Sequence, residues 1–242
     1  MVVQYTPYVL LALLSAAISV GVAIRVWQRR PGPGVVPLTL MVLGAAWWSL
    51  GYALEISTPD LETQVLIANL EYPGIATIPV MWFVFVLEYT GRGKKWLSRG
   101  TVALLLIVPF LTIVMALTND YHHLFRVSVT AVTEGPFPTF KSVYGPFFWV
   151  HTAYSYLMLT PGTILLIVTA LRMPKIYRRQ AITLLMGAGL PWIANILYVT
   201  GLGPIPSLDM TPFSFSLAGL ALGWSLIRYQ LMDVVPVARD II

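Results

Sequence analysis

The placement of lysine and arginine along this chain constrains its fold more strongly than any other feature. Seven apolar stretches, each near the roughly 20 residues that a membrane-spanning helix needs, are separated by polar connectors. All but two of the 15 basic residues lie in alternate connectors or at the C-terminal end, and only Arg126 and Lys141 lie in the other set. Because basic loops stay in the cytoplasm, the pattern predicts an outside N-terminus and a cytoplasmic C-terminus.

The apolar stretches predict an all-α membrane protein, a bundle of seven transmembrane helices. With their connectors they use nearly all of the 242 residues and leave no room for a soluble catalytic domain. We therefore expect a multi-pass protein of the inner or plasma membrane, with the lipid bilayer as a partner. The predicted spans are Tyr8–Trp27, Val35–Ile56, Leu66–Tyr89, Thr101–Leu117, Phe147–Leu171, Ala181–Val199 and Pro212–Tyr229.

The composition excludes several classes of function. Charged residues make up only 10% of the chain, against about 25% in soluble proteins. The net charge of +5 is explained by membrane anchoring and is no argument for a nucleic-acid partner. The chain has no cysteine, and two of its three histidines, His122 and His123, are adjacent, so that their side chains diverge. We predict no metal site and no cofactor.

The longest outer connector, between the fourth and fifth predicted helices, has its own pattern. Apolar residues alternate along 125–131, and Glu134–Pro136 has the composition of a turn. The alternation predicts a β-hairpin-like outer loop, although Pro136 and Pro138 weaken its second strand. A loop of this length in a compact fold is more often functional than not.

The two ends of the chain carry further expectations. The N-terminus lacks a basic region and a cleavage site, so the first helix is not a removable signal peptide. Near the other end, Pro236 suits the first turn of a new helix. We therefore expect residues 1–233 to form a seven-helix transmembrane domain and residues 234–242 to begin a truncated cytoplasmic helix.

Polar and aromatic residues converge in the outer halves of the predicted helices. Polar groups at membrane depth are costly and indicate function by default, and an aromatic lining with a few polar anchors is typical of a small-molecule site. The alternatives are interfacial anchoring of the Trp and Tyr side chains, core packing, and a simple interfacial role for the acids. The candidate ligand-binding residues are Trp48, Tyr52, Glu55, Glu71, Tyr72, Tyr154, Trp192, Asn195 and Asp209.

Three smaller patterns predict internal packing. Pro73, Pro79, Pro161 and Pro191 lie inside predicted spans, where each frees a carbonyl that a neighbour must satisfy. Glu88 is expected to pair with Arg92 one turn later. The pair Gly219 and Gly223 allows close helix contact, either inside the bundle or between two copies of the chain.

Six stretches, in order along the chain, resemble the N-terminal seven-transmembrane sensor region of prokaryotic histidine kinases. The resemblance implies an extracytoplasmic sensor fused to a PAS domain, a histidine kinase core or a diguanylate cyclase, and it names no ligand. Every candidate site residue except Tyr154 lies in one of these stretches. They are 47–55 (WWSLGYALE), 71–79 (EYPGIATIP), 87–91 (LEYTG), 190–198 (LPWIANILY), 209–213 (DMTPF) and 232–240 (MDVVPVARD).

We therefore expect a non-enzymatic sensory domain of a two-component receptor. It would detect an extracytoplasmic small molecule and signal through the seventh helix to an output domain, within a homodimer of the full-length receptor. A small-solute transporter or channel is the alternative, but it would need polar groups in the inner halves of the helices as well. A retinal photoreceptor would need a lysine inside the bundle, and a membrane enzyme would need a catalytic motif that this chain lacks.

Overall fold

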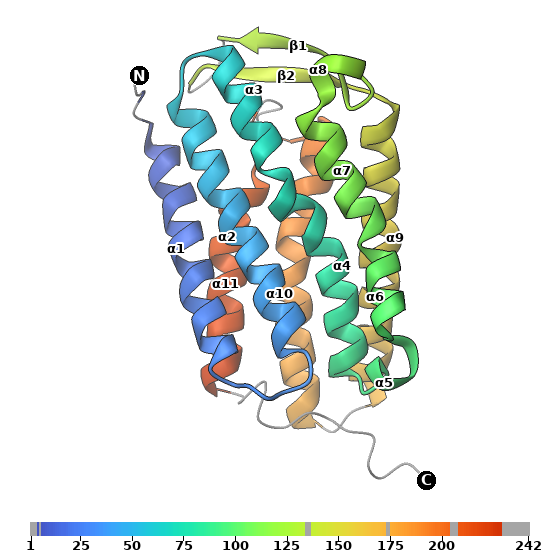
Figure 1. The fold of residues 1–242 in the computed structure, drawn as a ribbon. Helices are drawn as coiled ribbons and strands as arrows, with labels where there is room; N and C mark the ends of the chain where they lie inside the picture. The colour runs from blue at the N-terminus through green and yellow to red at the C-terminus, as the bar shows by residue number, and fades with distance from the viewer. Residues whose placement is uncertain (1–3, 5, 134–136, 173–174, 204–207, 229–242) are drawn as a thin grey trace.

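The computed structural model describes residues 4, 6–133, 137–172, 175–203 and 208–228. Long helices run side by side in one bundle, and a two-stranded sheet lies across one end of it (Figure 1). Short helices α5 (Gly93–Trp96) and α8 (Asn119–His122) lie at opposite ends of the bundle. The remaining helices are α1 (Pro7–Trp27), α2 (Val35–Ser57), α3 (Leu61–Leu70), α4 (Tyr72–Tyr89), α6 (Arg99–Leu105), α7 (Ile107–Leu117), α9 (Pro146–Arg172), α10 (Lys175–Val199) and α11 (Thr211–Arg228).

Within the described residues, six helical segments are long and apolar enough to cross a membrane. They are α1, α2, α3 with α4, α6 with α7, α9, and most of α10. Helix α11, which packs between α1 and α10, matches the seventh predicted span closely. Its role as a spanning helix and the outside location of the N-terminus stay predictions.

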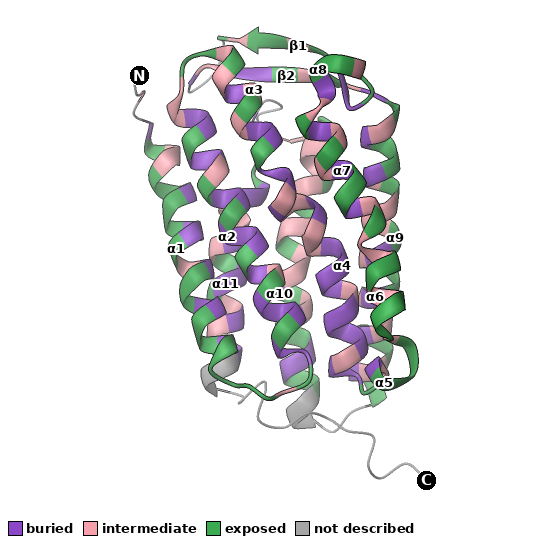
Figure 2. Cartoon of the chain, in the orientation of Figure 1, coloured by how far each residue is buried: buried purple, intermediate pink, exposed green. Residues whose placement is uncertain are grey.

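The outer surface of the bundle is apolar. Buried residues face inward, above all on the central helix α4, whereas exposed residues cover the outward faces of α1, α7 and α9 (Figure 2). Leu104, Phe110, Leu157 and Met186 are each at least 60% exposed. A soluble protein rarely exposes so much contiguous apolar surface, but such a surface suits contact with lipid hydrocarbon.

Helix α3 begins earlier than the predicted span at Leu66, because Asp60 caps it. The Asp60 carboxylate accepts hydrogen bonds from the Thr63 N–H at 2.8 Å and the Thr63 hydroxyl at 2.6 Å, which satisfies a backbone donor of the first turn. Because Glu62 and Gln64 are polar, hydropathy does not assign this turn to the membrane span. The expected third helix is therefore longer and starts in a polar region.

The third predicted span is divided at Glu71 into α3 and α4, and Pro73 gives the reason. Proline has no N–H to continue the helical hydrogen bonds. The Gly74 N–H donates to Glu71 O at 2.9 Å instead of to Leu70 O. The indole N–H of Trp47 donates to the freed Leu70 carbonyl at 2.7 Å, as expected for a proline inside a span.

The fourth predicted span is divided in the same way, into α6 and α7. Pro109 cannot donate to the Leu105 carbonyl one turn earlier. The Tyr154 hydroxyl, from α9, donates to that carbonyl at 2.7 Å. Tyr154 therefore has a structural role between α9 and the break, and its side chain packs with residues of α4 and α6.

Glycines allow close helix contacts at two places inside the bundle. Gly44 and Gly74 bring α2 and α4 together, and a Cβ atom on Gly74 would lie 2.5 Å from the Gly44 carbonyl oxygen. Gly219 and Gly223 of α11 face Ile18 and Val22 of α1. This glycine pair thus serves packing inside the bundle, one of its two predicted uses.

The predicted Glu88–Arg92 pair is wrong. A Glu88 carboxylate oxygen accepts the Gly34 N–H at 2.6 Å, in the turn between α1 and α2. The Arg92 guanidinium donates instead to the Thr169 hydroxyl at 3.3 Å. The backbone donor in the turn, where Gly34 has φ +81°, could not be anticipated from helical spacing alone.

The predicted β-hairpin is confirmed. Strands β1 (Arg126–Val132) and β2 (Thr139–Tyr144) are antiparallel, with Ser128 opposite Val143 and Ala131 opposite Phe140. The predicted turn at 134–136 lies outside the described residues, as does the proposed signalling helix at 234–242. The hairpin lies across the end of the bundle near α3 and α8 (Figure 1).

Two buried amides fix this hairpin to the bundle. Asn119 Oδ1 accepts the N–H groups of Phe125 and Arg126 at 3.1 and 2.9 Å, and its Nδ2 donates to Arg126 O at 3.1 Å. Gln64 Nε2 donates to Thr58 O at 2.7 Å and to Pro138 O at 3.0 Å. The sheet is therefore held by these polar contacts at the start of β1 and at the residue before β2.

Candidate ligand-binding site

A cavity of about 200 Å³ lies inside the bundle and extends to the hairpin. An engineered apolar cavity of roughly 150 Å³ holds a benzene molecule, so this space suits a small organic ligand. Residues of α2, α4, α9, α10, α11 and both strands contribute to its lining. Its end away from the hairpin is apolar and includes Trp82, Leu184 and Leu222, which belong to a buried cluster.

The structure brings together eight of the nine residues nominated from the sequence. Tyr154 does not line the cavity, although its neighbours Thr152, Ser155 and Tyr156 do. Its hydroxyl is used at Leu105, which removes the geometric basis for the predicted ligand contact. The eight that line the cavity are Trp48, Tyr52, Glu55, Glu71, Tyr72, Trp192, Asn195 and Asp209.

Three acidic side chains and one basic side chain occupy the end of the cavity near the hairpin. Glu55, Glu71 and Asp209 are only 7%, 4% and 7% exposed. Arg126, from the first residue of β1, is 5% exposed. The acids come from three segments that are far apart in sequence, at the end of α2, at the break between α3 and α4, and just before α11.

Glu55 and Glu71 interact directly. Their carboxyl groups lie within hydrogen-bonding reach of each other, and Glu71 also packs across Gly51, where a Cβ would lie 2.5 Å from Glu71 Cγ. Glu71 Oε1 is buried and meets no hydrogen-bond donor among the described residues. Two ionised carboxylates are both acceptors, so this contact requires a proton or an added donor.

Arg126 is the functional candidate that sequence reasoning missed. Its guanidinium donates a hydrogen bond to Asn69 Oδ1 and lies 5.7 Å from the centre of the Tyr72 ring. Its Nε is buried without a partner among the described residues. One signal was available: Arg126 is one of only two basic residues in the outer connectors, where most of the acids also lie.

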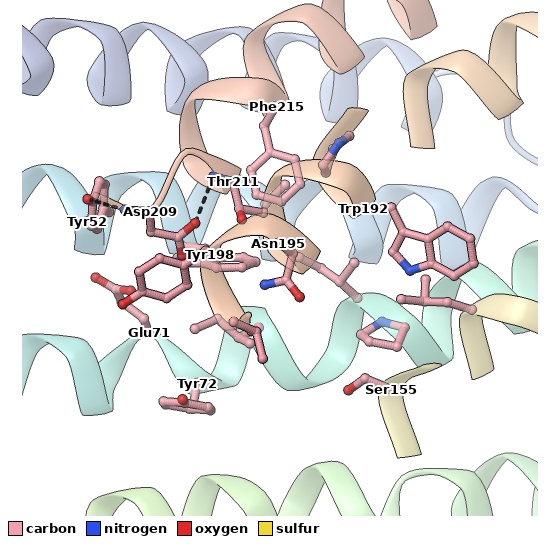
Figure 3. A pocket seen from close by; sticks show the side chains of 18 of the residues that line it. Tyr52, Glu71, Tyr72, Ser155, Trp192, Asn195, Tyr198, Asp209, Thr211 and Phe215 are labelled. Carbon is pink, nitrogen blue, oxygen red and sulfur yellow. Dashed lines mark hydrogen bonds between the residues drawn. The ribbon is translucent and has the colours of Figure 1, made fainter. Parts of the chain in front are cut away.

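Asp209 connects the acidic end of the cavity to the start of α11. Its backbone N–H donates to the Tyr52 hydroxyl at 3.0 Å, and its carboxylate accepts the Thr211 N–H at 2.8 Å (Figure 3). The second bond satisfies one of the free backbone donors at the helix start. Any change at this carboxylate therefore acts on the first turn of α11.

The other part of the cavity is aromatic and more weakly polar. The Tyr156 hydroxyl donates to Asn195 Oδ1 at 3.1 Å, and the Tyr156 ring lies 6.1 Å from that of Trp192. Figure 3 shows Trp192 and Ser155 at the opposite end of the view from Glu71. Asn195 lies between Glu71 and Trp192 in this view. Tyr198, which was not among the nominated residues, also lines the cavity, near Asp209.

Residues 11–236 match the family model described as the N-terminal 7TM region of histidine kinase. The chain belongs to this family. The match covers nearly the whole chain and confirms the resemblance seen in the six stretches. No curated protein matched the chain. As a member of the histidine kinase 7TM family, the chain is a sensory, multi-pass membrane domain, and the family region is not itself catalytic.

The site of this histidine kinase sensor domain has no grouping of the usual metal ligands. Among residues 4, 6–133, 137–172, 175–203 and 208–228, no three His, Asp or Glu side chains are arranged to hold a metal ion. The acids at the cavity therefore share a region without forming a coordination sphere. Their chemistry is that of hydrogen-bond acceptors and negative charges in a confined, aromatic space.

The Asp209 carboxyl predicts a pH dependence of stability. Burial raises its pKa from 3.8 to about 6, against the opposing hydrogen bond from the Thr211 N–H. The folded state therefore binds this proton more tightly than the unfolded state. The stability that the Asp209 carboxyl contributes to the folded state is full below about pH 4 and is lost as the pH rises through about 6. Between these limits, wild-type stability should fall relative to Asp209→Asn by up to about 3 kcal/mol.

The measurement is a pair of thermal denaturation series from pH 4 to 8. Asp120, which is exposed in α8, provides the matched control, and Asp120→Asn should leave the wild-type curve unchanged. Parallel curves for the wild type and Asp209→Asn would show that the Asp209 carboxyl does not titrate with folding.

Proposed function

We propose that this domain is the ligand-sensing part of a two-component receptor. A small molecule from outside the cell enters the cavity under the hairpin, and its binding changes how α11 begins. Helix α11 transmits the change to a cytoplasmic output domain, either a histidine kinase or a diguanylate cyclase, in a homodimeric receptor of the cell membrane. In this proposal the hairpin end of the bundle is extracytoplasmic, in accord with the distribution of basic residues.

One observation carries the proposal: the acidic end of the cavity and the first turn of α11 share Asp209. A ligand that contacts this carboxylate, or the Tyr52 hydroxyl beside it, alters two hydrogen bonds that position the helix start. Ser49 of α2 also donates to Pro212 O at 3.3 Å, so α2 holds this turn at a second point. A ligand shifts the balance between two bundle packings only if it binds one of them better.

The apolar end of the cavity argues against the transport alternative. A solute pathway needs polar groups that continue toward the opposite side of the membrane. In this cavity, Trp82, Leu184 and Leu222 occupy that direction and are no more than 7% exposed. The arrangement favours a closed binding site over a channel.

The proposed function predicts that a ligand stabilises the receptor. We would screen the full-length receptor in lipid nanodiscs against a metabolite library by thermal shift, and then measure output activity with each compound that binds. A ligand at 100 times its Kd should stabilise the folded state by about 2.7 kcal/mol. If no compound raises the melting temperature, the sensory proposal is wrong.

Tyr52→Phe tests the coupling step. The change removes the hydroxyl that accepts the Asp209 N–H, at a cost of about 1 kcal/mol, and we expect the ligand-dependent change in output to fall several-fold while the fold is retained. The control is Tyr8→Phe, since the Tyr8 ring packs on Phe137 and Phe213 and its hydroxyl makes no hydrogen bond to other described residues. An unchanged response in Tyr52→Phe would contradict coupling through Asp209.

A further inference from the structure

Unpartnered polar atoms gather around the cavity. Glu71 Oε1, Arg126 Nε and Trp192 Nε1 are buried, have no hydrogen-bond partner within the described residues, and belong to residues that line the cavity. More than about 90% of buried polar groups in native proteins have a partner. Their concentration at one cavity indicates that a bound molecule supplies their missing hydrogen-bond partners.

The chemistry of Glu71 defines what that partner must supply. Glu71 Oε1 is an acceptor, and the neighbouring Glu55 carboxyl offers only further acceptors when it is ionised. Placing the two carboxylates together in a buried site is costly unless a proton or a cation lies between them. The missing partner at this end is therefore a hydrogen-bond donor, and a positively charged donor satisfies both requirements.

The balance of charge favours the same conclusion. Three buried carboxyl groups face one buried guanidinium, so the site is net negative whenever more than one of the carboxyl groups is ionised, and a bound cation favours that ionised state. The Tyr52, Tyr72 and Tyr198 rings line the same end, and the faces of such rings attract cations. The acids are not grouped as metal ligands in the part of the chain that the structure describes, which favours an organic cation.

At the other end of the cavity, the buried Trp192 N–H is a donor without a partner among the described residues. A ligand that contacts Glu71 should therefore also carry a hydrogen-bond acceptor for Trp192. In Figure 3 Trp192 lies well away from Glu71, so the two ends of one elongated ligand would contact them separately. The cavity of about 200 Å³ limits this ligand to a small molecule.

On the basis of the proposed function, we infer that the ligand of this domain is a small protonated amine. Its ammonium group donates to Glu71 and Glu55 in place of their shared proton, which is released to water on binding, and its body lies along the aromatic wall toward Trp192. An N–H donor is required, so primary and secondary amines should bind better than a quaternary ammonium of the same size.

The test compares matched probes on the full-length receptor in nanodiscs. Each carbon skeleton, from ethyl to phenethyl, is used as an amine, an alcohol and a carboxylate, for example phenethylammonium, 2-phenylethanol and phenylacetate. We expect the best amine to bind about tenfold or more tightly than its alcohol, since its hydrogen bonds are charge-assisted, and the carboxylate to bind weakest. Choline supplies the quaternary comparison.

Variants assign the difference to the two carboxyls. Glu71→Gln removes the charge yet offers an amide N–H to Glu55, so the fold should hold, and the preference for the amine over the alcohol should disappear. Glu55→Gln should act in the same way from the opposite side. Glu62→Gln is the control, because Glu62 is exposed on α3, and it should retain the wild-type preference.

The outcomes separate this inference from the proposed function. An alcohol or carboxylate that binds as tightly as its amine, or an amine preference that survives in Glu71→Gln, overturns the inference. If other library compounds stabilise the receptor while no amine exceeds its alcohol, the inference also fails but the sensory function stands. If no compound of any class stabilises the receptor, the sensory function itself fails.

Discussion

Replacing Gly74 with alanine is expected to lower the stability of the domain substantially, by about 1–3 kcal/mol or more. A Cβ at this position would lie 2.5 Å from the Gly44 carbonyl oxygen and 3.2 Å from the Trp48 backbone nitrogen. These are backbone atoms of α2, which cannot turn aside as a flexible side chain can. The two helices must separate, and because Trp48 lines the cavity, ligand affinity should fall as well.

Gly21→Ala is the matched control for Gly74→Ala. Gly21 is also inside a helix, α1, but no atom lies within 4 Å of the Cβ that it would gain. Alanine is a better helix former than glycine by up to about 1 kcal/mol, so Gly21→Ala should leave the melting temperature equal or raise it. Thermal denaturation in nanodiscs measures both variants. If both shift the melting temperature equally, the close contact between α2 and α4 is not what Gly74 provides.

Asn119→Ala is the second substitution with a large expected effect. One amide side chain satisfies two N–H groups and one carbonyl at the base of β1, and Asn119 is only 7% exposed. Each buried backbone group left without a partner costs about 1–3 kcal/mol. Truncation should therefore release the start of β1, and with it Arg126, from its place at the cavity.

Hydrogen exchange distinguishes this local opening from global unfolding. In Asn119→Ala, the amides of 125–132 should exchange much faster, while the core helix α4 stays protected. Asp120→Ala, at the exposed neighbouring position, should leave both regions unchanged. Uniformly faster exchange throughout the bundle would show that Asn119 supports the whole fold, and unchanged exchange in β1 would show that other contacts hold the hairpin.

These two variants act on different walls of one site. Gly74 sets the spacing of α2 and α4, which carry Trp48, Tyr52, Glu55 and Tyr72, whereas Asn119 holds the strand that carries Arg126. A ligand that contacts both walls should bind less tightly in both variants. The same ligand should protect the amides of β1 in the wild type.

Much of the architecture was predictable from local sequence. Hydropathy located the long helices, with the largest differences at the starts of α3 (Leu61, predicted Leu66) and α10 (Lys175, predicted Ala181), and alternation of apolar residues located the hairpin. The predicted helix boundaries were wrong where an interaction other than hydropathy fixes the start of a helix. At Leu61, the Asp60 cap starts the helix among polar residues. The pairing of Glu88 failed for a related reason, since its partner is a backbone N–H brought near by the turn at Gly34.

The candidate site was partly predictable as well. Eight of the nominated residues line one cavity, because polar groups at membrane depth are rare enough to indicate a shared location. Tyr154 lies apart from them, since no sequence pattern shows that a proline on another helix frees the Leu105 carbonyl to which its hydroxyl donates. Arg126 was missed because a loop residue gives no periodicity from which to infer burial.

The sequence by itself determined the membrane class, the helical composition and the family, because these follow from the length of apolar runs, the side on which cations lie and short ordered motifs. Only the tertiary structure decided which polar groups meet. The contact of Glu55 with Glu71, the place of Arg126 above Tyr72 and the bond from Asp209 to Tyr52 join segments far apart in the chain. Such contacts depend on how helices and hairpin pack in three dimensions, which no local spacing specifies.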